Sequence, residues 1–165
     1  MTYKSHQSDG FTLVELITVM VLIGILAVSV GPRFFTGGTV PEATIEARLL
    51  SLLRLQQQRA MQDSINRCYG IQFSASQITP LDCAETVIAE RVIVPSDPVS
   101  VNVTSSLPGA GSEFLFNSLG CPVSSNHETS AEDCGLSNVE IQISGLETRQ
   151  ICIQSQGYIR SGACN

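Results

Sequence analysis

Three groups of residues in this 165-residue sequence could do chemistry: a glutamate inside an apolar run, a set of six cysteines, and an acidic loop that holds a histidine. The glutamate is Glu15, the one charged side chain between Phe11 and Gly31. A carboxylate at the centre of a membrane helix costs on the order of 3 kcal/mol, so such a residue is rare there and usually functional. Near one end of the helix it reaches the headgroups at little cost. The position of Glu15 alone leaves both interpretations open.

All six cysteines follow the apolar run, which favours disulfides in an oxidising compartment. They are Cys68, Cys83, Cys121, Cys134, Cys152 and Cys164. Six cysteines allow fifteen pairings, and their short, similar spacings favour sequential bridges, 68–83, 121–134 and 152–164. No Cys-x-x-Cys pair occurs and only one histidine follows the run, so a zinc site is not expected.

The third group lies in the loop SSNHETSAED between Cys121 and Cys134. The candidate partner-contact residues are Asn126, His127, Glu128 and Glu132. Clustered carboxylates suit Ca²⁺, but the loop lacks the glycines and alternating acids of an EF-hand, so no metal is expected. Binding residues concentrate on exposed loops, and we therefore interpret this loop either as a solvated turn or as a contact for a partner.

No pattern in the sequence predicts catalysis or a cofactor. A Ser-His-Asp arrangement would depend on His127, and neither G-x-S-x-G nor G-x-x-x-x-G-K-[ST] occurs. The net charge is −6, and three arginines oppose ten acids from Cys68 onward. Contacts to a phosphate backbone need clustered basic residues. Nucleic acid is therefore not an expected partner.

The apolar run at 11–31 organises the rest of the chain. At about 1.5 Å per residue it predicts a helix about 31 Å long, close to the hydrocarbon thickness of a bilayer. The apolar region of a cleaved secretory signal is shorter, about 7 to 15 residues, which favours a retained transmembrane anchor. Pro32 follows within the helical pattern, and residues 36–40 contain helix breakers. Pro41 suits the first position of a second helical segment.

Residues 42–66 predict an amphipathic helix that packs on a sheet. Its apolar stripe consists of Ile45, Leu49, Leu52, Leu53, Met61 and Ile65. Leu50 and Leu55 widen this stripe, either as a broader core face or as a surface for neighbouring subunits. After Cys68 the apolar period changes to two, which predicts six to eight short strands. The strand candidates are 69–73, 78–81, 91–94, 99–104, 113–117, 139–144, 149–154 and 157–160.

The leader MTYKSHQSDG followed by FTLVE resembles the class III signal of type IV prepilins and pseudopilins. The resemblance implies cleavage after Gly10 by a prepilin peptidase and methyltransferase, methylation of the new Phe11 amine, and a role for Glu15 in assembly. Asp9 departs from the family pattern, which usually has Lys or Arg at that position.

The assembly role has a physical basis. After cleavage Phe11 would carry an ammonium at the start of a helix, and Glu15 would lie one turn along, where the helix dipole favours a carboxylate. In a bundle of parallel helices, Glu15 of one subunit can pair with the Phe11 ammonium of its neighbour. In a low dielectric this pairing is strong and an unpaired partner is disfavoured. The pair would therefore select one axial stagger between subunits.

The remainder of the chain resembles pseudopilin H and the FimT-like minor pilins. The segments that carry this resemblance are LLSLLRLQQQRAMQDSINRCYGIQF, FLFNSLGCP, VEIQISG and RQICIQSQGYIRSG. The paired cysteines and the stretch GPRFF are most similar to the C minor pilins of the mannose-sensitive haemagglutinin (MSHA) pilus. The resemblance implies an α+β, type IV pilin-like fold, in which a long N-terminal helix, transmembrane and then amphipathic, packs on a β-rich globular head.

The expected organisation is a cleaved leader at 1–10, a transmembrane and filament-core helix at 11–31, its amphipathic continuation at 32–67, and a disulfide-stapled β-rich head at 68–165. The expected function is that of a minor pilin in an MSHA-type type IV pilus. The alternatives are a type II secretion pseudopilin H and a membrane-anchored binding or adhesion module. Expected partners are the peptidase, other pilins or pseudopilins, and the bacterial inner membrane. The head would lie in the periplasm before it reaches the cell surface.

Overall fold

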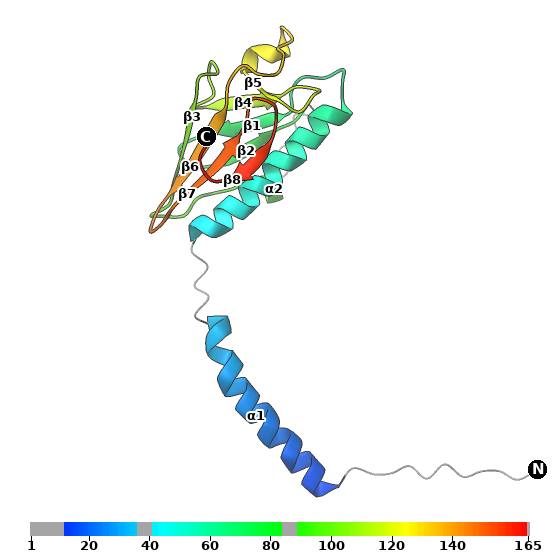
Figure 1. The fold of residues 1–165 in the computed structure, drawn as a ribbon, viewed down its shortest axis with the longest axis vertical. Coiled ribbons are helices and arrows are strands. Elements are labelled where there is room, and N and C mark those ends of the chain that lie inside the picture. Colours follow the sequence, from blue (N-terminus) through cyan, green and yellow to red (C-terminus); the bar gives the residue numbers. More distant parts are fainter. Residues whose placement is uncertain (1–11, 36–40, 84–88, 165) are drawn as a thin grey trace, which may run out of the picture. The chain divides into compact units, whose positions relative to one another are not determined.

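The structure is a computed structural model that describes residues 12–35, 41–83 and 89–164, with the backbone alone for 27–35. The chain forms two compact units, Met1–Gly38 and Thr39–Asn165. The first contains helix α1 (Leu13–Phe35), and the second contains helix α2 (Pro41–Gln62) and, within the described residues, eight strands (Figure 1). The predicted α+β fold class, with an N-terminal helix and a β-rich head, is confirmed.

Helix α1 continues through Gly31 and Pro32 and ends at Phe35. Pro32, which lacks a backbone donor, therefore does not end the helix. The helix breakers noted at 36–40 lie outside the described residues.

Within the described residues, no helix combines the length and the apolar character that crossing a membrane requires.

Helix α2 ends at Gln62 and not at the predicted residue 66. Asp63 accounts for this end, because its carboxylate accepts the backbone N–H groups of Ile65 and Asn66, both at 3.1 Å. These groups bond to a side chain and do not continue the helical ladder. The prediction that Met61 and Ile65 belong to the buried stripe is wrong, since their exposed fractions are 54% and 86%.

The buried face of α2 repeats every three to four residues, as an amphipathic helix requires. Its apolar members are Ile45, Leu49, Leu52, Leu53 and Ala60, the first four of which were predicted. Leu49 and Leu53 are fully buried, and burial of each stabilises the head by roughly 1.5–3 kcal/mol. The same face buries three polar side chains that the apolar pattern did not indicate: Glu42, Glu46 and Gln56.

Two antiparallel four-stranded sheets complete the head (Figure 1). The first has the order β2-β1-β4-β5 and consists of β1 (Gly70–Phe73), β2 (Ile78–Leu81), β4 (Glu113–Phe116) and β5 (Pro122–Val123). The second has the order β3-β6-β7-β8 and consists of β3 (Ser100–Ser105), β6 (Val139–Ser144), β7 (Thr148–Ile153) and β8 (Ile159–Ser161). Helix α2 contacts strands of both sheets.

The core lies between α2 and the two sheets. Phe114 of β4 stacks on Phe73 with ring centroids 6.0 Å apart, and it meets the edge of Phe116 at 5.6 Å. The second sheet contributes four fully buried isoleucines, Ile141, Ile143, Ile151 and Ile153. Alternation along β6 and β7 places these side chains on the inner face.

The predicted strand at 91–94 is wrong. Residues Ala89–Arg91 form the short 3₁₀ helix η1, and Ile93 makes only an isolated bridge to Ile78. Pro95 has no backbone donor, so the pairing cannot extend past this point in the usual way. Strand β5 was not predicted, because a strand of two residues is too short to show an alternating pattern.

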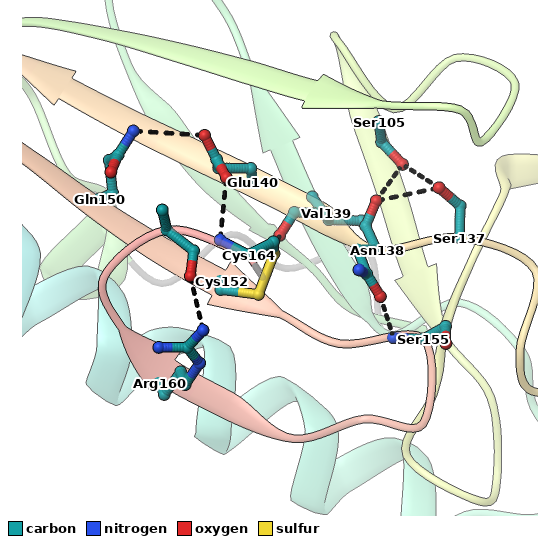
Figure 2. Close-up of a disulfide and its surroundings, with 11 residues drawn as sticks. Ser105, Ser137, Asn138, Val139, Glu140, Gln150, Cys152, Ser155, Arg160 and Cys164 are labelled. Atoms are coloured by element: carbon teal, nitrogen blue, oxygen red, sulfur yellow. Dashed lines mark hydrogen bonds between the residues drawn. A yellow bond between two sulfur atoms is a disulfide. The ribbon is translucent and has the colours of Figure 1, made fainter.

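The three sequential disulfides that the cysteine spacing favoured are present. In the chain-entropy model each loop of this length stabilises the fold by roughly 3 kcal/mol. The bridge between Cys152 and Cys164 holds the segment after β8 against the second sheet (Figure 2). There the Cys164 N–H donates to Glu140 Oε2 at 3.0 Å, and Arg160 Nη2 donates to the carbonyl oxygen of Ala163 at 2.6 Å.

Candidate functional site

Glu15 lies in the first turn of α1, three residues after Thr12, which caps the helix. Thr12 Oγ1 accepts the backbone N–H of Glu15 at 3.3 Å, as an N-cap side chain does. One turn further on, the Thr18 hydroxyl bonds to the carbonyl oxygens of Val14 and Glu15, both at 2.9 Å. In the part of the chain that the structure describes, the Glu15 carboxylate makes no hydrogen bond or ion pair.

The apolar side chains in the described part of α1, from Leu13 to Leu26, are exposed. From Leu13 to Leu26, the large apolar residues have exposed fractions between 49% and 75%. Glu15 lines one shallow face of the helix, together with Leu16, Val19, Met20 and Ile23. An exposed apolar surface of this extent is typical of an interaction site.

The other predicted residues of the amino-terminal motif are Gly10 and Phe11, the expected cleavage site and methylated residue. Both lie outside the described residues.

The loop proposed as a partner contact contains the short 3₁₀ helix η2 (Ser125–Glu128) and is closed by the bridge between Cys121 and Cys134. Of its four candidate residues, Asn126 and Glu128 are exposed. His127 is only 4% exposed, and the Glu132 carboxylate accepts both the N–H and the hydroxyl of Ser124, at 2.7 and 2.6 Å. Asn126 and Glu128 therefore face the solvent, whereas His127 and Glu132 hold the loop together.

His127 has a structural contact that also fixes its tautomer. Its Nδ1 accepts the backbone N–H of Glu132 at 2.8 Å. Burial lowers the pKa of His127 below its usual value, and the nearby Arg67 lowers this pKa further, while Glu132 opposes the change. The imidazole is accordingly neutral at pH 7, which is the form that can accept this hydrogen bond.

Two glutamates on the buried face of α2 were not recognised as candidate residues from the sequence. Glu42 is fully buried, and its Oε1 accepts the backbone N–H groups of Leu146 and Glu147 in the turn between β6 and β7. The pKa of Glu42 is lowered by a hydrogen bond from its own backbone N–H, which outweighs burial, and by the two bonds from the turn. A side chain at Gly145 would clash with this carboxylate.

Glu46 lies one turn after Glu42 and joins α2 to two strands of the second sheet. Its Oε2 is 3.1 Å from Arg149 Nη1 on β7, and its Oε1 accepts the hydroxyl of Ser161 on β8. Hydrogen bonds to Glu46, and secondarily to Glu147, raise the pKa of Arg149. The spacing 42, 46, 49, 53 was a signal for these residues, because it continues the buried stripe toward the start of the helix.

The other end of α2 is tied to the head by polar side chains as well. Gln57 Nε2 donates to the carbonyl oxygens of Gly120 and Gly157, at 2.7 and 2.6 Å. Arg59 pairs with Asp82 after β2. Bonds at both ends therefore attach α2 to turns of both sheets.

Comparison with known proteins identifies the amino-terminal motif. Residues 6–31 match the prokaryotic N-terminal methylation motif. The matched range includes Gly10, Phe11 and Glu15 and reaches into α1. No curated protein sequence matches the chain.

Two crystal structures of the type IV minor pilin FimU from Pseudomonas aeruginosa PAO1, in different crystal forms, are similar to 69% of this chain. The sequence identity is 14% and the TM-score is 0.39 in both comparisons, which cover 90% and 85% of the FimU chains.

Proposed function

We propose that this protein is a type IV pilin-like minor pilin, a structural subunit that enters a filament through α1. A prepilin peptidase and methyltransferase would first remove residues 1–10 and methylate Phe11. The observation that carries the proposal is the methylation motif at 6–31, which leads into a helix that is apolar on all sides and has one carboxylate in its first turn. Lipid would cover this helix in the bacterial inner membrane before assembly, and neighbouring helices would cover it in the filament.

Glu15 would set the position of each subunit in the filament. Cleavage creates an ammonium at Phe11, and the Glu15 carboxylate of another subunit can approach this ammonium when the helices pack in parallel. A carboxylate buried without a cation is strongly disfavoured in a low dielectric. The pair would therefore favour one axial offset between helices over the others.

The head would face the periplasm and then the cell surface. Three disulfides suit it to an oxidising compartment. The two glutamates of α2 attach the helix to the second sheet, so force on the filament core would pass into a rigid head. Asn126 and Glu128, exposed on the bridged loop, are the proposed partner contacts of the head.

Among minor pilins, we propose that the chain is most similar in role to the C minor pilins of the MSHA pilus. The paired cysteines and the GPRFF stretch support this proposal. A type II secretion pseudopilin H would share the same helix and the same processing. Deletion of the gene separates these functions, because a minor pilin predicts loss or shortening of pili, whereas a pseudopilin predicts retained exoproteins.

The decisive experiment replaces Glu15 with alanine and follows the protein into sheared filaments. We expect Glu15→Ala to be cleaved, methylated and retained in the membrane, yet depleted from the filament fraction. Thr18→Ala, which removes a polar group one turn further along α1, is the matched control and should enter filaments normally. Intact mass of the membrane-extracted protein reports leader loss, one added methyl group and three disulfides together.

Two results would contradict the proposal. The first is a mature chain that begins at any residue other than Phe11. The second is incorporation of Glu15→Ala at the level of the wild type, which would instead favour a membrane-anchored binding module whose helix serves only as a tether.

A further inference from the structure

The two sheets have four edge strands, and three of them carry features that block the addition of another strand. Strand β2 contains Pro80 and is bridged on its outer side by Ile93. Strand β5 has two residues and begins with Pro122, and β8 has three residues and includes Arg160. Proline, charge and short length are the usual means of protecting an exposed edge.

Strand β3 is the fourth edge and has none of these features. Its six residues, SVNVTS, contain no proline and no charged side chain. It pairs along its whole length with β6, from Ser100 opposite Ser144 to Ser105 opposite Val139. No other described strand lies against it, and Figure 1 shows it at the side of its sheet away from β8. A long, uncharged edge of this kind is a template for a further strand.

The two faces of β3 define which strand can be added. Val101 and Val103 are half-buried and pack against the core, while Ser100, Asn102 and Thr104 are exposed. Because side chains alternate along a strand, an added strand must place apolar residues beside the valines and polar residues beside the others.

We propose that β3 pairs edge to edge with β3 of a second copy of this chain, in an antiparallel register that places Asn102 opposite Asn102. In this register Val101 lies opposite Val103 on the inner face, and Ser100 lies opposite Thr104 on the outer face. The two members of each pair then have the same polarity, and matched cross-strand pairs stabilise a sheet. A shift by one residue would place valine opposite a polar residue and lose this match.

The self-pairing also satisfies the geometry of a closed dimer. A register centred on one residue has a two-fold axis, so the same surface serves both copies and the contact does not propagate. The sheet that contains β3 in one copy would join the same sheet of the second copy. The joined sheet would have eight strands in the order β8-β7-β6-β3-β3-β6-β7-β8, which lies within the usual size of sheets. This contact involves the head alone and depends neither on leader cleavage nor on Glu15.

The test uses the full chain in detergent and measures the dimer fraction by native mass spectrometry over a range of concentrations. We expect the wild type to dimerise, and Asn102→Lys and Asn102→Glu each to reduce the dimer fraction about fivefold or more, because like charges would then face each other. An equimolar mixture of the two variants should restore the dimer as a heterodimer with its own mass. Asn102 is exposed and its side chain makes no hydrogen bond in the described structure, so neither variant should unfold the head.

Gln58→Lys is the matched control, because it makes the same kind of change at an exposed position of α2, and it should leave the dimer intact. The proposal is overturned if the wild type stays monomeric. The same holds if the wild type stays monomeric and its β3 edge binds an extended segment of another protein instead. A dimer that Asn102→Lys leaves unchanged, as contact through α1 would produce, also overturns it. So does a mixture that forms no excess of heterodimer.

Discussion

Glu46 Oε2 on helix α2 lies 3.1 Å from Arg149 Nη1 on strand β7, a contact between residues 103 positions apart in the sequence. Glu46 is largely shielded from solvent, with a side-chain exposure of 10%, whereas Arg149 keeps 35%. Arg149 also reaches Glu147, so one guanidinium joins the start of α2 to the turn between β6 and β7. The contact shows how the helix that follows α1 is attached to the sheet.

Replacement of Glu46 by alanine should weaken this attachment. The change leaves Arg149 and the Ser161 hydroxyl without their buried acceptor, and an unsatisfied group costs more than the bond itself contributes. We expect the melting temperature to fall by roughly 5 °C. Glu147→Ala, which removes the exposed second partner of Arg149, should change it little, since exposed ion pairs contribute little. Equal losses in the two variants would contradict the role assigned to Glu46.

Replacement of Leu53 by alanine should destabilise the head strongly. Leu53 is fully buried, so truncation leaves a cavity and costs about 2–5 kcal/mol of unfolding free energy. Met61→Ala on the same helix should cost little, because Met61 is more than half exposed. Urea unfolding of the two variants measures the difference. A comparable loss at Met61 would mean that the buried stripe extends to the end of α2, as the sequence pattern suggested.

The stability of the head should depend on the ionisation of Asp63 below pH 4. Hydrogen bonds from the side chain and backbone of Asn66, and from the Tyr69 hydroxyl, lower the pKa of Asp63 from 3.8 to about 2. Because the folded state has the lower pKa, the unfolded state binds more protons in this range. The stabilisation is therefore present above about pH 4 and is lost as the pH falls toward 2. Asp63→Asn should remove this dependence. The difference in unfolding free energy between the wild type and this variant should therefore narrow as the pH falls from about 4 toward 2. A difference that stays constant with pH would exclude this role for Asp63.

Replacement of Gly157 by alanine should destabilise the turn between β7 and β8. Gly157 has a φ of 89°, which disfavours other residues, and an added Cβ would clash with the carbonyl oxygen of Gly120. The loss of stability should exceed about 1 kcal/mol. Gly111→Ala is the control, since an added Cβ there meets nothing within 4 Å. A thermal melt in which both variants behave alike would contradict the close packing described at Gly157.

Features that depend on neighbouring residues could be predicted from the sequence. The amino-terminal motif, the apolar helix that follows it, the start of α2 at Pro41 and most of the strands follow from short-range spacing and periodicity. The three disulfides also join cysteines that are close in sequence. In each case the signal lies between residues that are close in the sequence, so no knowledge of the packing was needed.

Other features were decided only by contacts between distant segments. Glu42 and Glu46 are charged, yet segments about a hundred residues later bury them. Backbone N–H groups of the turn between β6 and β7 donate to Glu42 Oε1, and Arg149 and Ser161 donate to the two carboxylate oxygens of Glu46. The capping bonds at Asp63 ended α2 before the apolar pattern did. The open edge at β3 exists because β6 is its one partner among the strands that the structure describes. Periodicity reports which face of an element is apolar, but the partner of that face and the partners of its polar atoms are set by the three-dimensional arrangement of the whole head.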